Sequence, residues 1–339
     1  MNDVSATDDI QSIAANFPAS RFFRNCLSVR ESADGLVPLR FTEAQLAVYA
    51  KTEQYRARSL CPAGIKIDVV TDSRFIKIDY SVGALIRGWV NFDIHLDGVL
   101  VDSLTSAPPT QSKGSLRWKL PDNPGGSRQL SVYLSQCAEL TVRRLGFSAG
   151  ASVREAPAGK GRLLCLGDSI TQGMEAHHPS CTYAVLLARA LGYDLLNQGV
   201  GGFVFDADSL DPALAFKPDI VTVAYGTNDW NRCASHEAFA YNAATYLEKL
   251  IGIFPESRIA VLSPIWRKDL REIESAGTFR SIGKTIERIC TLHPTLRFMD
   301  GMDLIPHQER FFGDGKLHPT DEGFAHFALN LTANLSAKS

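Results

Sequence analysis

The pattern of apolar residues changes abruptly before the middle of this 339-residue chain. From residue 20 to residue 150 the apolar runs are short and rich in β-branched and aromatic residues, and they often alternate with polar residues, as in 75–80. Further on, short apolar runs alternate with longer amphipathic segments. Between these parts, residues 150–161 are small and polar and include Gly and Pro, which is typical of a linker. The change predicts an N-terminal domain of residues 1–155 and a C-terminal domain of residues 156–339.

The N-terminal part is expected to be an antiparallel β-sandwich of the jelly-roll kind. Turn-forming residues interrupt its apolar runs at short intervals, and this spacing is typical of sandwiches. Residues 42–58 are an exception, because they have a helical pattern with Thr42 and Glu43 at its start. The predicted strands cover residues 64–70, 75–82, 89–96, 129–134 and 140–147.

The C-terminal part is expected to be a three-layer α/β/α domain. Its short apolar strands are separated by helical segments, which favours a parallel sheet covered by helices on both faces. Ligands of such sheets bind at the carboxyl ends of the strands, so the chemistry should lie in the loops that follow them. The predicted strands are 163–166, 194–197, 219–224, 258–262 and 296–299, and the predicted helices are 182–191, 237–253, 279–292 and 322–335.

Composition and charge exclude several classes of protein. The formal net charge is −2, from 35 basic and 37 acidic side chains, so a nucleic-acid partner is not expected. No apolar run approaches the roughly 20 residues of a membrane-spanning helix, so a membrane partner is not expected either. The seven cysteines are scattered without metal-ligand spacing, and the first 17 residues are acidic and lack the features of a secretory signal. We therefore expect a cytoplasmic protein, and nothing in the sequence bears on its oligomeric state.

A serine stands directly after the first strand of the C-terminal part. Ser169 lies in the segment Gly-Asp-Ser-Ile, at the opening of a helix, where its hydroxyl and its backbone N–H face the same space. A serine in this position can act as a nucleophile. Asp168 or Ser169 can equally be the N-cap of that helix. From this segment alone both interpretations stay open.

The loops after the later strands add glycines, an amide and an acid–imidazole pair. Residues 197–202 read Asn-Gln-Gly-Val-Gly-Gly, which indicates a close approach of the backbone but does not match a phosphate or dinucleotide loop. Asn228 follows the third strand, where it is either a turn residue or a side-chain N–H donor. Asp314 and His318 share a loop before the last helix, where the acid can orient the imidazole to accept a proton.

These four segments, in this order, resemble the blocks of the SGNH (GDSL-type) hydrolases. The resemblance covers roughly residues 160–335. It implies that Ser169 is the nucleophile, that His318 is the general base and that Asp314 is the acid that orients His318. The family usually has the spacing Asp-x-x-His, whereas three residues separate the acid from the imidazole here. Either the loop bulges and Asp314 still reaches His318, or a backbone carbonyl holds the imidazole instead.

The resemblance also implies an oxyanion hole. Its donors would be the backbone N–H groups of Ser169 and Gly202 and the side chain of Asn228. Gly202 is preferred to Gly201, because the family's donor is the last glycine of this block. No metal and no organic cofactor is implied.

Three further residues near these loops are candidates for substrate contact. Trp230 follows Asn228 and either lines the substrate site or packs in the interior. His177 lies shortly after the serine segment and is expected to contact substrate rather than a metal. Arg267 follows the fourth strand, where it either binds an anionic or sugar group or forms an ion pair.

The resemblance implies a serine esterase. A sandwich followed by an SGNH domain is similar to the arrangement in carbohydrate esterases that remove acetyl groups from sugars. We therefore expect hydrolysis of short-chain esters, above all acetyl esters of carbohydrate-like or small-metabolite alcohols, through an acyl-enzyme on Ser169. A lysophospholipase or thioesterase acting on longer acyl chains is the alternative enzyme. A carbohydrate-binding protein without catalysis is the alternative from another class.

Overall fold

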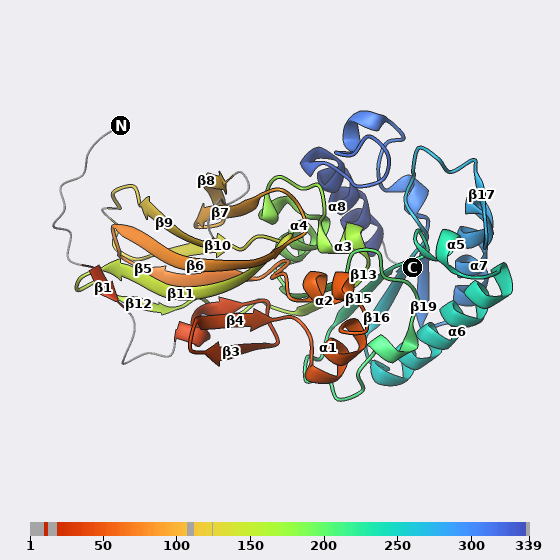
Figure 1. Cartoon of the computed structure of the whole chain (residues 1–339), viewed down its shortest axis with the longest axis horizontal. Helices are drawn as coiled ribbons and strands as arrows, with labels where there is room; N and C mark the ends of the chain where they lie inside the picture. Colours follow the sequence, from red (N-terminus) through yellow and green to blue (C-terminus); the bar gives the residue numbers. More distant parts are fainter. Residues whose placement is uncertain (1–9, 13–18, 107–111, 124, 337–339) are drawn as a thin grey trace.

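The chain forms an antiparallel β part and an α/β part, which lie next to each other along the longest axis of the molecule (Figure 1). The computed structural model describes residues 10–12, 19–106, 112–123 and 125–336. Most of the N-terminal segment that the secretory-signal prediction used lies outside these described residues. Within them, none of the helices has the length and apolar character that crossing a membrane would need.

The N-terminal part is a sandwich of two antiparallel sheets, as expected. In the described residues one sheet has the order β3-β4-β11-β6-β9 with β1 added on β11, and the other has the order β12-β5-β10-β7-β8 with β2 added on β5. The inward side chains of the two sheets, such as those of Ile67, Ile78 and Phe92, form one buried core. The strands are β1 (Ile10–Ser12), β2 (Phe23–Arg24), β3 (Ser28–Ser32), β4 (Gly35–Leu39), β5 (Lys66–Thr71), β6 (Phe75–Leu85), β7 (Val90–Leu96), β8 (Val99–Ser106), β9 (Lys113–Lys119), β10 (Arg128–Tyr133), β11 (Ala138–Ser148) and β12 (Val153–Glu155).

The helical segment expected within the N-terminal part is two short helices rather than one. Helix α1 (Glu43–Tyr49) begins after Thr42, whose hydroxyl accepts the Gln45 N–H while the Gln45 side chain accepts the Thr42 N–H. This reciprocal capping box confirms the predicted start. Thr52 caps a second helix, α2 (Glu53–Ser59), which the continuous apolar pattern did not separate from the first. Both helices lie beside the α/β part in Figure 1.

The C-terminal part is a parallel sheet with the strand order β14-β13-β15-β16-β19. All five predicted strands are confirmed. Because the chain passes from β13 to β14 on one side and then to β15 on the other, the loops after β13, β14 and β15 meet at a switch point of the sheet. The strands are β13 (Arg162–Gly167), β14 (Asp194–Gly199), β15 (Ile220–Ala224), β16 (Arg258–Leu262) and β19 (Leu296–Met299).

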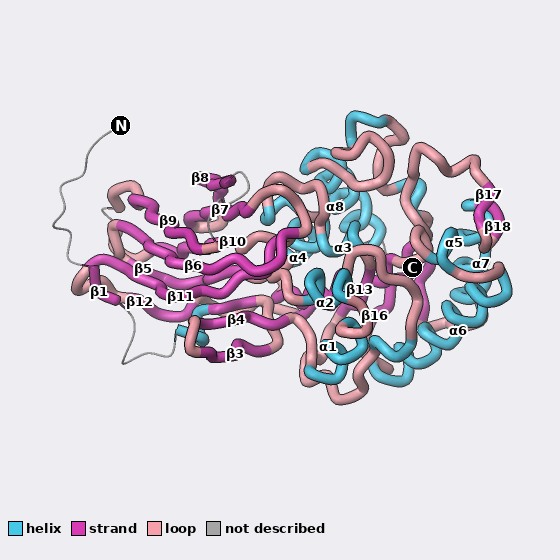
Figure 2. The backbone as a smooth tube through the Cα atoms, in the orientation of Figure 1, coloured by secondary structure: helices cyan, strands magenta, loops and turns pink. Residues whose placement is uncertain are grey.

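Helices cover both faces of this sheet, so the expected three-layer architecture is confirmed (Figure 2). On one face α4 and α8 pack together, and the rings of Tyr183 and Phe327 stack with their centroids 4.1 Å apart. On the other face α6 and α7 bury Tyr246 and Ile282. The helices are α3 (Ser169–Gln172), α4 (Tyr183–Leu191), α5 (Asp229–Arg232), α6 (His236–Ile253), α7 (Phe279–Thr291) and α8 (Asp321–Ser336), and β17 (Ile273–Glu274) pairs with β18 (Gly277–Thr278) in a small hairpin.

Candidate active site

The serine loop follows the central strand β13. Asp168 caps helix α3 by accepting the Ile170 N–H at 2.9 Å, so Ser169 is the first helical residue, and only 4% of it is exposed. The turn requires glycine at position 167, because an added Cβ would lie 2.1 Å from the hydroxyl oxygen of Thr171. The helix cap that the sequence left open therefore belongs to Asp168, and the Ser169 hydroxyl has a different partner.

That partner is His318, from the loop before α8. Its Nε2 lies 2.9 Å from Ser169 Oγ, and its Nδ1 lies 2.6 Å from Asp314 Oδ2. A carboxylate at Nδ1 favours the tautomer with the hydrogen on Nδ1, which leaves Nε2 as the acceptor for the serine hydroxyl. The structure thus brings Ser169, His318 and Asp314 into one chain of hydrogen bonds.

The loop from Asp314 to His318 accommodates its extra residue by local turns. Gly315 adopts a left-handed conformation with φ of 66°, and the Gly313 N–H donates to the His318 carbonyl at 2.8 Å, which closes the loop. Asp314 Oδ1 accepts the backbone N–H groups of the three residues after Gly315, while Oδ2 faces the imidazole. Burial opposes ionisation, but these hydrogen bonds outweigh it and hold the pKa of Asp314 well below its usual range. Of the two arrangements that the sequence left open, the structure has the one in which Asp314 reaches His318.

The glycine loop, residues 197–202, spans the end of β14 and the turn after it, and it lies against the serine helix. A Cβ at Gly199 would lie 2.3 Å from the backbone nitrogen of Gln172, so the two segments touch through their backbones. The Gly201 N–H donates to Gln172 Oε1 at 2.8 Å. Gly202 has a left-handed φ of 76°, and its N–H has no acceptor within the described part of the chain. This difference supports Gly202 rather than Gly201 as an oxyanion donor.

Asn228 stands at the start of α5, and its side chain is held by the residue that precedes the serine. Its amide nitrogen donates to Asp168 Oδ2 at 2.9 Å and to the Phe203 carbonyl at 3.2 Å. Burial raises the pKa of Asp168 to about 7, although the Ile170 N–H bond opposes this shift. Asp168 therefore both caps the serine helix and orients Asn228. The sequence analysis considered Asp168 only as the helix cap. Its position directly before Ser169 was the signal that it could also contact other residues of the site.

A buried arginine from the N-terminal part fixes the glycine loop. Arg40 is 1% exposed, and its guanidinium donates to the carbonyl oxygens of Asn197 and Gly199 at 2.8 Å each, of Cys61 at 2.7 Å and of Arg58 at 2.9 Å. Burial lowers the pKa of Arg40 to about 10, so the side chain stays charged at neutral pH. The sequence analysis missed Arg40, because a lone arginine between a strand and a helix forms no recognisable pattern.

The N-terminal part also contacts the loop after α3, where His177 lies. The Asn91 amide donates to the His177 carbonyl at 2.6 Å, and the His177 and Trp89 rings stack with their centroids 5.6 Å apart. The next residue, His178, contacts Asp93 with its Nδ1 at 3.0 Å. His177 is exposed, so its predicted substrate contact stays a prediction.

The structure argues against the other two substrate-contact predictions. Trp230 is fully buried in the core, and its indole N–H donates to the Gly277 carbonyl at 2.8 Å. Arg267 is 6% exposed and forms a two-point ion pair with Asp269, while its guanidinium lies over the Trp230 ring. The packing alternative therefore describes Trp230 and the ion-pair alternative describes Arg267, because neither side chain presents a surface to a ligand.

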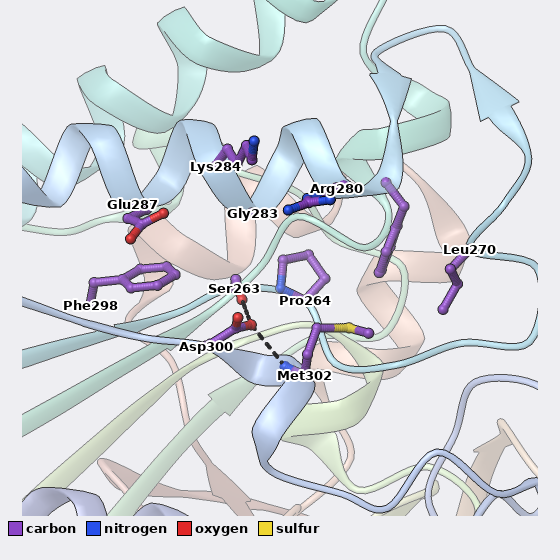
Figure 3. A pocket seen from close by; sticks show the side chains of 11 residues that line it. Ser263, Pro264, Leu270, Arg280, Gly283, Lys284, Glu287, Phe298, Asp300 and Met302 are labelled. Carbon is purple, nitrogen blue, oxygen red and sulfur yellow. Dashed lines mark hydrogen bonds between the residues drawn. The ribbon is translucent and has the colours of Figure 1, made fainter.

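A cavity of about 380 Å³ lies at the far edge of the sheet, beyond the ends of β16 and β19 (Figure 3). Its lining combines apolar side chains such as Pro264 and Phe298 with the charged side chains of Arg280, Lys284 and Glu287 on α7. None of the described residues that line it belongs to the predicted catalytic or oxyanion set. The cavity is therefore separate from the Ser169–His318 centre.

The sequence of the α/β part matches a known family. Residues 165–326 match the sequence model of the GDSL-like Lipase/Acylhydrolase family, and this range contains Ser169, Gly202, Asn228 and the Asp314–His318 loop. The match covers the α/β part, a little under half of the chain, and it identifies that part as an ester hydrolase domain of the SGNH type. A comparison with curated protein sequences finds no match.

Solved structures of the same fold align with nearly the whole chain. The salicylyl-acyltransferase SsfX3 from a tetracycline biosynthetic pathway is 19% identical, with a TM-score of 0.77 over 96% of this chain and 97% of that one. A putative GDSL-like lipase from Bacteroides ovatus is 19% identical, with a TM-score of 0.75 over 97% of each chain. The acetyl xylan esterase Est2A from Butyrivibrio proteoclasticus is 15% identical, with a TM-score of 0.61 over 96% of this chain and 97% of that one. These likenesses show a shared fold that includes the sandwich.

Proposed function

We propose that this protein is a serine esterase that hydrolyses short-chain esters, above all acetyl esters of carbohydrate-like or small-metabolite alcohols. The observation that carries the proposal is the continuous hydrogen-bonded chain from Ser169 Oγ through His318 to Asp314. A nucleophile, a base in contact with it and an acid behind the base are the groups that acyl transfer requires.

In this mechanism Ser169 Oγ attacks the ester carbonyl carbon while its proton passes to His318 Nε2, 2.9 Å away. The tetrahedral intermediate collapses, the carbon–oxygen bond to the alcohol breaks, and His318 returns the proton to the departing oxygen. Water then attacks the acyl-enzyme with His318 again as the base, which releases the acid and restores the serine. Asp314 stays ionised throughout and stabilises the imidazolium.

The oxyanion of each intermediate would be stabilised by the backbone N–H groups of Ser169 and Gly202 and by Asn228. The Asn228 amide already donates to Asp168 and, in a longer contact, to the Phe203 carbonyl. We infer that the oxyanion replaces the Phe203 carbonyl as acceptor, while the bond to Asp168 keeps the amide oriented. Each such donor contributes about 3 kcal/mol to transition-state stabilisation in comparable sites.

The substrate class is inferred from the architecture. One protein of the same two-part fold is an acetyl xylan esterase, which supports an acetyl ester of a sugar-like alcohol. Another is an acyltransferase, in which an alcohol rather than water accepts the acyl group. Adding a nucleophilic alcohol to the reaction therefore shows whether this enzyme transfers acyl groups as well as hydrolysing esters.

The test is hydrolysis of a series of p-nitrophenyl esters, from acetate to long-chain acyl groups, by the wild type and Ser169→Ala. Ser127→Ala, which changes an exposed serine far from the site in sequence, is the matched control. We expect turnover of acetate that decreases with chain length, disappears in Ser169→Ala and persists in Ser127→Ala. A preference for long chains would favour the lysophospholipase or thioesterase alternative. Turnover that survives in Ser169→Ala would reject the proposal.

A further inference from the structure

Two arginines from different parts of the chain converge on the glycine loop. Arg58, on α2 of the N-terminal part, donates from Nη1 to the Gly201 carbonyl at 2.6 Å. Arg232, on α5, donates from Nη1 to the Gly202 carbonyl at 2.5 Å. A Cβ built on Gly202 would lie 2.9 Å from Arg58 Nη1 and 3.2 Å from Arg232 Nη2. The two guanidinium groups therefore flank Gly202, whose N–H is proposed above as an oxyanion donor.

Neither of these arginines has a carboxylate partner among the described residues. Arg58 Nε is buried without a hydrogen-bond partner, and the other nitrogens of this side chain contact the Gly201 carbonyl and the Gln54 side chain. Burial lowers the pKa of Arg58, and the charges of Arg87 and Arg232 lower it further. The guanidinium groups thus repel one another without a counter-charge between them.

Three acidic groups of the surrounding segments have other partners. Glu175 forms an ion pair with Arg87 at 2.5 Å. Asp168 and Asp229 influence Arg232 electrostatically, but both carboxyls are buried and hydrogen-bonded inside the fold, and burial raises their pKa values to about 7 and about 6. None of these carboxyl groups forms an ion pair with Arg58 or Arg232 within the described part of the chain.

Arg40 shows how the same fold treats an arginine with a purely structural role. Its guanidinium is fully buried, and four carbonyl oxygens accept its hydrogen bonds. Arg232, by contrast, is exposed, and Arg58 is only half-buried. Guanidinium groups that lie close to one point and keep some access to solvent are suited to binding a carboxylate, a phosphate or a sulfate together.

We propose that Arg58 and Arg232 form an anion subsite for the substrate, so that the preferred esters carry a carboxylate near the reacting carbonyl. This inference rests on the proposed function, because the subsite lies beside the proposed oxyanion loop. The inference adds one requirement to the proposed acetyl-ester substrate, namely a negative charge. The carboxylate belongs either to the alcohol half or to the acyl half of the ester, and the experiment distinguishes the two.

The experiment compares charged and neutral esters of nearly the same shape. On the alcohol side the pair is 4-acetoxybenzoate and its methyl ester, and on the acyl side it is monomethyl succinate and dimethyl succinate. Each kcat/KM is divided by the rate of the same ester with hydroxide, which removes differences in intrinsic reactivity. In the wild type we expect the anionic member of one pair to exceed its neutral partner by about 10-fold or more, the size of one charge-assisted hydrogen bond.

The variants are Arg58→Gln and Arg232→Gln, with Arg288→Gln on the exposed surface of α7 as the matched control. We expect the anionic-to-neutral ratio to fall to about one in both variants, to stay unchanged in the control, and to decrease with added salt in the wild type. If the arginines only support the glycine loop, both members of each pair lose activity equally and the ratio does not change. That result, or a wild-type ratio of one or less for both pairs, would overturn the proposal.

Two further readouts separate this proposal from the function on which it rests. Ser169-dependent hydrolysis of the neutral esters without any anionic preference would reject the subsite and leave the esterase assignment intact. If the arginine variants fail to fold, inhibition of the wild type serves instead. Benzoate should inhibit hydrolysis of p-nitrophenyl acetate competitively and at least about 10-fold more strongly than benzamide, and equal inhibition would reject the subsite.

Discussion

The two loops that complete the candidate site are held in opposite ways. The loop from Asp314 to His318 is self-contained, because its carboxylate, its imidazole and its stabilising backbone N–H groups lie within five consecutive positions. The glycine loop is held from outside by Gln172 and by Arg40 and Arg58 of the N-terminal part. The base is therefore a local feature of the α/β part, whereas the proposed oxyanion hole depends on the sandwich side of the molecule.

The largest expected effect is on the base side. His318→Ala removes the only group in the account that takes the serine proton, so we expect kcat to fall by at least about 10³-fold. The His318 side chain is supported by its own loop, so the thermal midpoint should change little. A comparison with His293→Ala, which replaces a histidine after α7, controls for loss of an imidazole. Activity within 10-fold of the wild type would exclude His318 as the base.

Asp314→Asn tests the acid within the same loop. The amide would favour the wrong tautomer of His318, because it can donate a hydrogen bond to Nδ1, and we expect kcat to fall by about 10²- to 10⁴-fold. Asp300→Asn, at an exposed acid after β19, is a matched substitution outside the triad. If Asp314→Asn kept nearly full activity, the imidazole would not need the acid, in spite of the 2.6 Å contact.

Arg40→Met tests the other side of the comparison. Removal of the guanidinium leaves buried carbonyl oxygens without donors, so we expect a loss of about 3 kcal/mol in the free energy of unfolding. The released glycine loop should also reduce kcat by about 10²-fold, the size of one lost oxyanion donor. Arg143→Met, at an exposed position in β11, is the control. Loss of stability without loss of kcat in the folded fraction would show that the loop does not depend on Arg40.

The smallest expected effect is on the pH dependence of stability. It should differ between Asp314, in the self-contained loop, and Asp168, which caps the serine helix beside the glycine loop. Asp314 has a lowered pKa, so its contribution to stability is present above its ordinary pKa of 3.8 and is lost as the pH falls below that value. Asp168 has a pKa raised to about 7, so the folded state keeps a proton that the unfolded chain releases, and stability falls as the pH rises from about 4 to about 7.

Urea unfolding of the wild type, Asp168→Asn and Asp314→Asn between pH 3 and pH 8 measures how each carboxyl changes the free energy of unfolding with pH. The wild type should lose stability relative to Asp168→Asn between about pH 4 and pH 7, and relative to Asp314→Asn below about pH 4. If the stability of the wild type and of Asp168→Asn changed with pH in parallel, the pKa of Asp168 in the folded protein would be close to its ordinary value.

The same contrast explains what the sequence could and could not predict. Strand and helix periodicity gave the parallel sheet and the sandwich, and the residues after the strands indicated Ser169, Asn228 and the Asp314–His318 loop, because these features are local. The break between α1 and α2 was missed, since the apolar pattern runs through Thr52. Arg40 was missed because it acts only when the chain brings it to carbonyls more than 150 residues away.

The structure argues against two of the three substrate-contact predictions, those for Trp230 and Arg267, for the same physical reason. Trp230 and Arg267 follow strands at the correct edge of the sheet, but position along the chain does not reveal which way a side chain points. In the fold Arg267 forms an ion pair with Asp269, and its guanidinium lies over the Trp230 ring in the interior. Burial and pairing are properties of the folded chain, and no spacing pattern encodes them.

The central claim is that acyl transfer passes through Ser169, activated by His318. Labelling with an organophosphate fluoride tests it directly, because the reagent forms a stable phosphoryl ester with an activated serine, and peptide mass spectrometry locates the adduct. We predict one adduct in the wild type, on the peptide that contains Ser169, with no adduct in Ser169→Ala and much slower labelling in His318→Ala. Labelling of a different serine, or undiminished labelling of Ser169→Ala, would contradict the account.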